Sequence, residues 1–381
     1  MRAGFFTEVY RPVVNGVVAS IDALAAGLRE LGHEVSVFAP GAPGSDRDEP
    51  PVFRIPSLPL PIASPYRLTV PHVRRGPRHA VIDHLQIVHA HSPFVTGWMA
   101  ARIARRLRVP LIYTYHTRLE EYAHYVPFEA NATKRAAEAL TRTYANTADA
   151  VVVPTHAMQE RLLELGVEVP IEIVPSGIDL ELFGGGRRSD ALRTRLGVKP
   201  GQRLLFTVSR LAREKNIDLL LHALARTRVP ALLAIAGEGP YEPDLRALVQ
   251  SLGLQDRVVF IGPVQREELP HYYASADAFV FASVTETQGM VLAEALAAGA
   301  SVIAADVPQV RDVLGGAGAV AAPDASAFAL AFEAIPRGRS AGGAALAQSG
   351  ARRFGHLEQA RKVEALYDQL TRTYVRYTIK P

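Results

Sequence analysis

The feature that most constrains this chain is an alternation, repeated from end to end, between short apolar runs rich in β-forming residues and segments with helical periodicity. This alternation is typical of parallel sheets with helices on both faces, because each parallel connection has to cross back over the sheet. With 381 residues, the chain is longer than one hydrophobic core usually serves. We therefore expect an α/β fold with two doubly wound domains.

Strands of the expected first domain alternate with amphipathic helices over the first half of the chain. The predicted strands are Arg2–Phe6, Val35–Ala39, Val52–Ile55, Gln86–Ala90, Leu111–Tyr115, Ala150–Pro154 and Ile171–Val174. Between the first two, apolar residues recur at helical spacing from Ile21 to Leu31, and Gly32 then ends the helix. The pattern stops in the polar sequence GGGRRSD, residues 184–190, which we interpret as a flexible linker.

The same scheme restarts in the second half. The predicted strands there are Leu204–Ser209, Ala231–Ala236, Val258–Ile261, Ala278–Phe281, Ser301–Ala304 and Ala319–Ala321, and a long helix is predicted over Leu357–Tyr377. We therefore place one domain at residues 1–185, a second at 186–360, and a C-terminal helix at 361–381 that crosses back to the first. Neither half carries G-x-G-x-x-G after its first strand, which disfavours a redox dinucleotide-binding domain.

Composition disfavours several other classes of protein. The chain has no cysteine, which excludes a disulfide framework and a thiolate metal site. Its formal net charge is +4 and its pI is about 9.3, but it lacks the aromatic-interleaved basic stripe of a nucleic-acid-binding protein. No apolar run approaches the roughly 18 to 20 residues of a spanning helix, and the opening MRAGFFTE has no signal-peptide pattern. We expect a cytoplasmic protein that binds no nucleic acid.

Two cations follow the first predicted strand of the second half. Arg210 stands at the carboxyl end of that strand, and Lys215 is expected in the first turn of the next helix. A cation at a helix N-terminus opposes the helix dipole unless an anion lies between them. A diphosphate bound by the Arg210 fork and the Lys215 ammonium would resolve the conflict. From this segment alone, a pair of solvated surface cations explains the residues as well.

A second candidate is the segment ETQGMVLAE, in which Glu286 and Glu294 are separated by seven residues. If Glu286 lies in a loop and Glu294 two turns inside the following helix, both carboxylates can face one groove and accept hydrogen bonds from sugar hydroxyls. Gly289 near the helix start would let a ligand approach the backbone amides there. The residues around it are Thr287, Gln288 and Met290. Two carboxylates on one face of a helix are also commonly exposed to solvent and bind no ligand.

Two residues of the first half complete the candidates. Gly16 opens the first helix, whose free amides could bind a phosphate, although a plain strand-to-helix turn also explains a glycine there. His116 follows the strand Leu111–Tyr115 and is either a structural hydrogen bonder or a functional group in a cleft. His89 and His91 flank the end of the neighbouring strand without indicating a metal.

Taken together, these segments resemble retaining glycosyltransferases of family 4, which have the GT-B fold. FFTEVYRPVVNGVVASI at residues 5–21, SRLAREKN at 209–216 and the two glutamates occur in the order found in that family. The resemblance covers nearly the whole chain and is more specific than any single motif. It implies two Rossmann-like domains facing across a cleft, with the acceptor bound by residues 1–185 and the donor by residues 186–360.

The resemblance also implies a role for each candidate residue. Arg210 and Lys215 would neutralise the donor diphosphate, Glu294 would bind the ribose, and Glu286 with residues 287–290 would hold the transferred sugar; Gly16 would approach the phosphates and His116 the sugar. The family needs no bound metal or other cofactor. Asp46 and Asp48 spell the D-x-D motif of metal-dependent sugar transferases, but they lie in a Gly/Pro-rich loop, so we interpret them as solvated.

Within the family, YTYHTRLEEYAHYVPF at residues 113–128 and TETQG at 285–289 resemble bacterial diacylglycerol glycosyltransferases. The apolar, proline-interrupted stretch Val52–Pro71 is compatible with a surface seated on an anionic membrane. Basic residues accompany it, namely Arg74, Arg75 and Arg78, and Arg102, Arg105, Arg106 and Arg108 after Trp98. We therefore expect a peripheral protein on the inner face of the membrane, with diacylglycerol as acceptor and a UDP-sugar as donor.

Alternatives remain open at this level. Apolar loop residues can equally cap the core of the first domain, the acceptor can be a soluble or polyprenyl-linked sugar, and related enzymes use GDP-mannose. Two proteins of other classes would also bind a nucleotide sugar. A UDP-sugar epimerase would isomerise its substrate without an acceptor, and a nucleotide-sugar sensor would bind without turnover.

Overall fold

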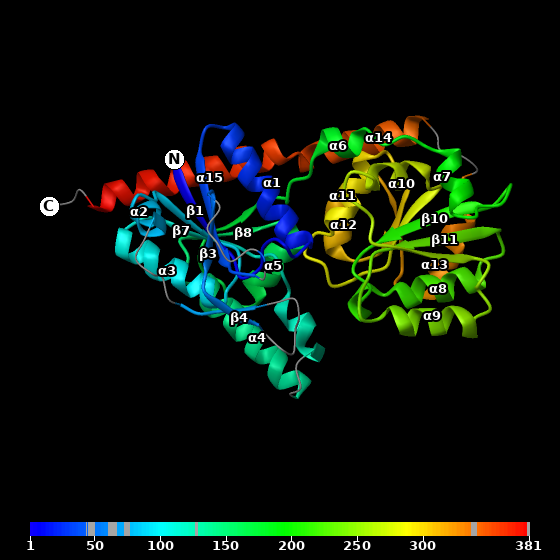
Figure 1. Cartoon of the computed structure of the whole chain (residues 1–381), viewed down its shortest axis with the longest axis horizontal. Helices are drawn as coiled ribbons and strands as arrows, with labels where there is room; N and C mark the ends of the chain where they lie inside the picture. Colours follow the sequence, from blue (N-terminus) through cyan, green and yellow to red (C-terminus); the bar gives the residue numbers. More distant parts are fainter. Residues whose placement is uncertain are drawn as a thin grey trace. The chain divides into compact units, whose positions relative to one another are not determined.

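The computed structural model describes residues 1–42, 44, 50–59, 67–71, 77–125, 129–336 and 341–378. It divides into two compact units, the first comprising Met1–Gly177 with His356–Pro381 and the second Ile178–Gly355 (Figure 1). The units therefore divide after Gly177 and Gly355, a few residues before the boundaries at 185 and 360 expected from the sequence. The expected linker, residues 184–190, lies inside the second unit.

The first unit is built on a parallel seven-stranded sheet in the order β3-β2-β1-β6-β7-β8-β9. Its strands are β1 Arg2–Phe6, β2 Glu34–Pro40, β3 Val52–Ile55, β6 Ile87–Ala90, β7 Leu111–Thr114, β8 Ala150–Val153 and β9 Ile171–Ile173. All of them occur where the apolar runs predicted strands. Strand order reverses between β1 and β6, because the chain adds β2 and β3 on one side of β1 and then β6 on the other.

Helices cover both faces of this sheet. They are α1 Gly16–Glu30, α2 Pro77–Asp83, α3 Val95–Leu107, α4 Ala130–Ala145, α5 His156–Glu164 and α15 His356–Thr378, with a 3₁₀ helix η1 at Leu119–Tyr125. Helices α1 and α15 lie side by side on one face (Figure 1). A Cβ atom on Gly27 would lie 2.7 Å from the carbonyl oxygen of His356, so glycine is needed for this close contact. Helices α3, α4 and α5 contribute to the core on the other face.

A two-stranded antiparallel hairpin, β4 Ser57–Pro59 and β5 Arg67–Thr69, was not predicted. The sequence indicated a loop after β3, because three-residue strands in a proline-interrupted stretch are too short to show the alternation of inward and outward side chains that marks a strand. Residues 60–66, between the two strands, lie outside the described part of the chain. Thr69 is buried, whereas Leu58 and Leu68 are exposed, so part of the apolar stretch packs inward and part faces outward.

The second unit has a six-stranded parallel sheet in the order β12-β11-β10-β13-β14-β15. Its strands are β10 Arg203–Val208, β11 Ala231–Ala236, β12 Val258–Gly262, β13 Ala278–Phe281, β14 Val302–Ala305 and β15 Ala319–Ala321, again as predicted. The order reverses between β10 and β13. Each unit is therefore a doubly wound parallel sheet, which confirms the predicted fold class.

Both faces of the second sheet are covered as well. Its helices are α6 Leu180–Gly184, α7 Asp190–Arg195, η2 Arg213–Lys215, α8 Ile217–Arg226, α9 Glu242–Ser251, α10 Leu269–Ser275, α11 Met290–Ala297, α12 Pro308–Leu314, α13 Ala325–Glu333, α14 Ala341–Ala351 and η3 Arg352–Phe354. One core contains α8, α9 and α13, and the other contains α6, α10, α11 and α14. Within the described part of the chain, no helix combines the length and apolarity needed to cross a bilayer.

Candidate active site

Ligands of doubly wound sheets bind at the carboxyl edge, where the strand order reverses. In the second unit this edge is formed by the segments that follow β10 and β13. Arg210 and Lys215 come from the first segment, and Glu286 comes from the second. The fold therefore brings together, at the switch point of one sheet, three residues that the sequence identified separately.

Lys215 and Glu286 form an ion pair that links the two segments. Lys215 ends the 3₁₀ turn η2, whereas α8 begins only at Ile217, so its expected place in the first turn of the helix is wrong. The left-handed residue Asn216, with φ of 51°, separates the turn from the helix. Its side-chain amide donates to the carbonyl oxygen of Ala282 at 3.2 Å. This second bond holds the Lys215 backbone against the segment after β13.

Arg210 is paired within its own segment. Its guanidinium donates to Glu214 Oε1 at 2.9 Å, and the Glu214 side chain is only 3% exposed while that of Arg210 is 41% exposed. The Ser283 hydroxyl donates to the carbonyl oxygen of Glu214 at 3.1 Å. Glu214, which the sequence analysis did not single out, therefore orients the Arg210 fork at the edge of the sheet. Neither cation is simply solvated.

Two glycines hold the loop that carries Arg210. Gly237 follows β11 with φ of 113°, and a Cβ atom there would lie 1.9 Å from the carbonyl oxygen of Ser209. A Cβ on Gly239 would lie 2.3 Å from the carbonyl oxygen of Leu211. Any side chain would displace the backbone on either side of Arg210. The segment GEGP, residues 237–240, is therefore a packing element of the site as well as a turn.

Helix α11 begins at Met290 after Gly289, which adopts φ of 75°. No described side chain caps this N-terminus and its first turn contains no acidic residue. The Leu292 amide already donates to the Gly289 carbonyl oxygen at 2.9 Å, and the helix N-terminus as a whole favours an anion. Gln288 is buried and Met290 is half-buried. Thr287 lies in the loop before them. The role of Gly289 in admitting a ligand to the helix start stays a prediction.

Glu294 lies about one turn inside α11, not two, because the helix begins at Met290. Its carboxylate is buried, accepts a hydrogen bond from the Tyr273 hydroxyl at 3.0 Å and lies 3.8 Å from the Arg266 guanidinium. Burial raises the pKa of Glu294, and Arg266 and Tyr273 oppose the rise. Tyr273 and Arg266 were not foreseen, since they come from α10 and the loop before it.

In the first unit, His116 is bonded to His91. Nδ1 of His91 lies 3.0 Å from Nε2 of His116, and these residues follow the adjacent strands β6 and β7. Burial lowers the pKa of His116 to about 4, so its imidazole is neutral at pH 7. His116 therefore serves as a hydrogen-bonding group, and not as a cation, at neutral pH.

Gly16 opens α1 as predicted, and the Asn15 side chain caps that helix by accepting from the Val18 amide at 2.9 Å. One amide of the expected phosphate cradle is thus already bonded. A Cβ atom on Gly16 would meet no atom within 4 Å. Packing inside this unit therefore gives no reason for glycine at this position, and its proposed approach to phosphate stays a prediction.

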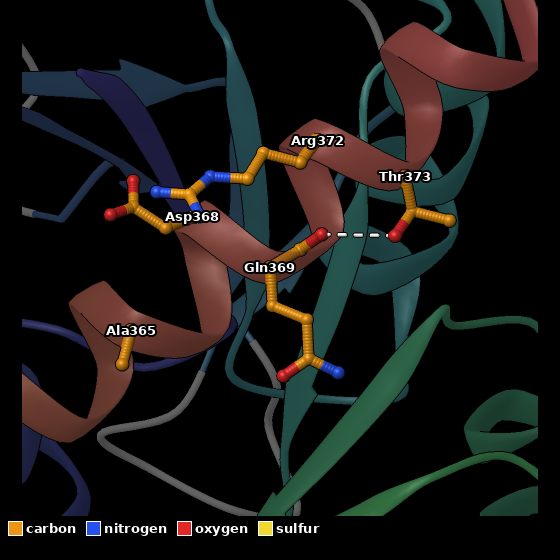
Figure 2. Close-up of a pocket in the computed structure, with 5 residues that line it drawn as sticks. All are labelled: Ala365, Asp368, Gln369, Arg372 and Thr373. Carbon is orange, nitrogen blue, oxygen red and sulfur yellow. Dashed lines mark hydrogen bonds between the residues drawn. The ribbon is translucent and has the colours of Figure 1, made fainter.

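No group of three or more His, Asp or Glu side chains among the described residues is arranged to hold a metal ion. The D-x-D sequence at 46–48 lies outside the described part of the chain, as do Arg74 and Arg75, and the Arg78 side chain is not described either. A hollow on α15 is bordered by residues of that helix alone, including Asp368 and Arg372 (Figure 2). Because no other described element lines it, it is a groove in the helix surface.

Both halves of the chain are similar to known glycosyltransferases. Residues 14–182 match the model of Glycosyltransferase Family 4, and residues 189–338 match that of Glycosyl transferases group 1. An alpha-monoglucosyldiacylglycerol synthase of Streptococcus pneumoniae is 34% identical over 82% of this chain and 73% of its own length. A GDP-mannose-dependent alpha-mannosyltransferase of Mycobacterium tuberculosis is 33% identical over 82% of this chain and 81% of its own.

A solved structure shares the architecture. HepE of Anabaena, crystallised with UDP and glucose, superposes with a TM-score of 0.74 at 20% identity, over 97% of this chain and 100% of that one. This likeness shows the GT-B fold, and the matches to both family models and to these relatives make the chain a glycosyltransferase that uses a nucleotide-sugar donor. The chain belongs to glycosyltransferase family 4.

Proposed function

We propose that this glycosyltransferase moves a hexosyl or N-acetylhexosaminyl group, with retention of configuration, from a UDP-sugar to diacylglycerol at a membrane surface. The observation that carries the proposal is the 34% identity to alpha-monoglucosyldiacylglycerol synthases of two organisms, over 82% and 80% of this chain. The contacts of the second unit support the donor chemistry, and exposed residues of the first unit support the acceptor.

Arg210 and Lys215 would bind the donor diphosphate. Each is held by a carboxylate, Glu214 and Glu286 respectively, so the two positive groups keep defined positions before a donor arrives. As the bond from sugar C1 to the phosphate oxygen breaks, negative charge grows on the leaving diphosphate. Preorganised cations and the amides at the start of α11 stabilise that charge without first having to reorient.

The sugar and the ribose would be held by carboxylates. Glu286 would accept hydrogen bonds from sugar hydroxyls with the oxygen that Lys215 does not use, and the start of α11 follows it closely in the chain. Glu294 would accept from the ribose. Its rigid support by Tyr273 and Arg266 favours a binding role over proton transfer.

Retention would follow from attack on the same face that the diphosphate leaves. The acceptor hydroxyl forms its bond to C1, and its proton passes to the departing phosphate oxygen, so no protein base is required. His116 would then hydrogen-bond to the transferred sugar and orient it. Its neutral imidazole suits this task, because the pKa of about 4 keeps it uncharged at neutral pH.

A surface of the first unit supports a lipid acceptor. Phe94 and Trp98 are 43% and 42% exposed and stand four residues apart at the start of α3. Arg102, Arg105 and Arg106 continue the same helix and are exposed. Aromatic residues followed by arginines are typical of elements that lie in a membrane interface and contact anionic lipid. We call these five residues the α3 stripe.

The β4–β5 hairpin is joined to α3. Glu8 accepts from the Thr69 amide of β5 at 3.2 Å and from the Thr96 amide of α3 at 2.9 Å. The exposed Leu58 and Leu68 of the hairpin therefore belong to an element that neighbours the α3 stripe. In our proposal, this surface attaches the protein peripherally to the inner face of a membrane.

A second donor deserves a direct test, because the relative from Mycobacterium tuberculosis is GDP-mannose-dependent. Incubation with diacylglycerol vesicles and either UDP-glucose or GDP-mannose, followed by NMR of the purified lipid, distinguishes the two. We expect an α-glycosyl diacylglycerol from the UDP-sugar. A β-anomer would contradict retention, and product from GDP-mannose alone would replace the donor.

A further inference from the structure

Three histidines gather at the carboxyl edge of the first sheet. His89 lies in β6, His91 directly follows it, and His116 follows the neighbouring strand β7. Their rings are stacked, with centroids 4.4 Å apart between His89 and His91 and 5.2 Å apart between His91 and His116. The group adjoins the position where the strand order reverses, between β1 and β6.

The bond between His91 and His116 joins two imidazoles. Nδ1 of His91 and Nε2 of His116 are 3.0 Å apart, so one nitrogen carries the shared proton and the other accepts it. His91 is 3% exposed, and its other nitrogen, Nε2, makes no hydrogen bond to any described residue. The protonation state of that second nitrogen depends on the direction of the bond.

The unbonded nitrogen indicates which ring donates. If His91 accepted at Nδ1, its own proton would lie on Nε2 as a buried N–H without an acceptor. If His91 donates, Nε2 is an acceptor that lacks a donor. Buried donors without a partner are rarer in proteins than acceptors without one. Donation from His91 to His116 is therefore the favoured direction.

We propose that His91 is a positioning residue for His116: it donates from Nδ1 to Nε2 of His116 and holds that ring in the tautomer protonated at Nδ1. The catalytic consequence rests on the proposed function, in which His116 contacts the transferred sugar. With its tautomer set in advance, His116 keeps its proton at Nδ1 and does not exchange between the two neutral tautomers.

The surroundings of His91 fix its ring. Its ring centroid lies 4.7 Å from that of Phe5 on one side, and the stacked His89 is itself bonded to the Tyr367 hydroxyl at 2.7 Å and to Thr114 at 2.6 Å. Burial lowers the pKa of His91 well below its usual range. A rigid, neutral imidazole can orient a neighbouring ring without altering its charge.

The direct test is a measurement on the unaltered protein. Histidine-selective ¹⁵N labelling and long-range ¹H–¹⁵N spectra report which ring nitrogens carry protons, and a coupling across the hydrogen bond identifies the pair. We expect His116 to be protonated at Nδ1 and its Nε2 to be coupled to Nδ1 of His91. Protonation of His116 at Nε2, or averaging between both tautomers, would overturn the proposal.

Three variants extend the test to catalysis. H91F keeps a ring but removes the donor, and we expect mixed tautomers of His116 and a kcat roughly 10²-fold lower at little-changed KM for donor. H91N keeps an amide where Nδ1 stood, and we expect it to restore much of kcat and the single tautomer. H84Q alters an exposed histidine of the same unit and should leave the His91 and His116 signals and kcat unchanged.

The spectra and the kinetics separate two failures. A single Nδ1-protonated tautomer that persists in H91F contradicts positioning by His91. If H91F changes the tautomer while kcat stays at the level of the unaltered enzyme, positioning is upheld and the proposed role of His116 in transfer fails. Should H91F not fold, the coupling in the unaltered protein still decides the proposal.

Discussion

Lys215 and Glu286 form an ion pair between the segments that follow β10 and β13, the two strands at which the order of the second sheet reverses. The pair places a cation and a carboxylate at the edge where such sheets bind ligands. Its partners stand 71 positions apart in the chain. In our account the ammonium serves the diphosphate and the carboxylate serves the sugar.

Substitution of Lys215 or Arg210 by alanine should abolish most transfer without unfolding the protein. Each variant loses a positive group that stabilises the leaving diphosphate, and we expect kcat to fall about 10²-fold or more. Steady-state kinetics with purified variants measure this. R213A is the matched control, because exposed Arg213 lies in the same turn but stacks on Tyr241. Near-normal rates in both K215A and R210A would contradict the site.

Glu286 and Lys215 should act as a coupled unit. E286Q keeps the shape of the side chain but removes the charge that holds Lys215, so part of its cost comes from a misplaced ammonium. We therefore expect the double variant K215A/E286Q to lose much less transition-state stabilisation than the sum of the two single variants. A cycle of kcat/KM values that is additive would show that the ion pair has no part in the reaction.

Buried Glu294 should make the second unit less stable as pH rises. Burial raises its pKa above the ordinary value of 4.5, so the folded state binds this proton more tightly than the unfolded state does. The resulting stabilisation is present below pH 4.5 and is lost as pH rises through the folded pKa. E294Q cannot ionise. Calorimetric unfolding between pH 4 and 8 should show E294Q gaining stability relative to the unaltered protein as pH rises, whereas a constant difference would contradict this.

His116 should make the first unit sensitive to acid. Burial lowers its pKa from 6.5 to about 4, so between these values the unfolded chain takes up a proton that the folded chain does not. Its contribution to stability is present above pH 6.5 and is lost as pH falls toward 4. Trp98, the single tryptophan, lies in this unit and reports its unfolding.

The acid effect can be isolated with H116Q, which does not titrate. Trp98 fluorescence in urea gives the free energy of unfolding between pH 6.5 and 4.5. This free energy should decrease less steeply with acid in H116Q than in the unaltered protein. The difference between the two slopes should correspond to the uptake of about one proton per molecule. Equal slopes in the two proteins would mean that His116 keeps an ordinary pKa when folded.

The α3 stripe should bind anionic membranes. Replacing Phe94 and Trp98 by serine removes the apolar part, and replacing Arg102 and Arg105 by glutamate reverses the basic part. Sedimentation with vesicles of phosphatidylglycerol and phosphatidylcholine should show weaker binding for both variants, and binding of the unaltered protein should weaken with salt. L163S removes an exposed leucine from α5 and serves as the control. Equal binding of all the proteins would refute the stripe as the attachment surface.

The sheets could be predicted because their strands are continuous apolar runs. Strand β11, Ala231–Ala236, is buried at every position and cannot be confused with a surface helix. The hairpin strands β4 and β5 could not, since each has three residues, and their pairing depends on a partner across a segment with no periodic pattern. Such short elements are set by tertiary contacts rather than local preference.

The candidate site was predicted in part for a related reason. Arg210, Lys215 and Glu286 lie in the segments that follow β10 and β13, so the rule that ligands bind at carboxyl ends was enough to select them. Their partners were not accessible to that rule. Glu214 appears as an ordinary helix-start acid, and Tyr273 pairs with Glu294 only because α10 packs beside α11. A signal was present for His91, since it follows β6 just as His116 follows β7.

The most direct test of the central claim is a transfer assay read by mass spectrometry. The purified enzyme is mixed with pooled UDP- and GDP-sugars and offered diacylglycerol in mixed micelles or, separately, soluble sugar acceptors. Our account predicts diacylglycerol carrying one hexose or N-acetylhexosamine, formed from a UDP-sugar. Transfer to soluble acceptors alone, with the lipid unchanged, would contradict the account of the acceptor.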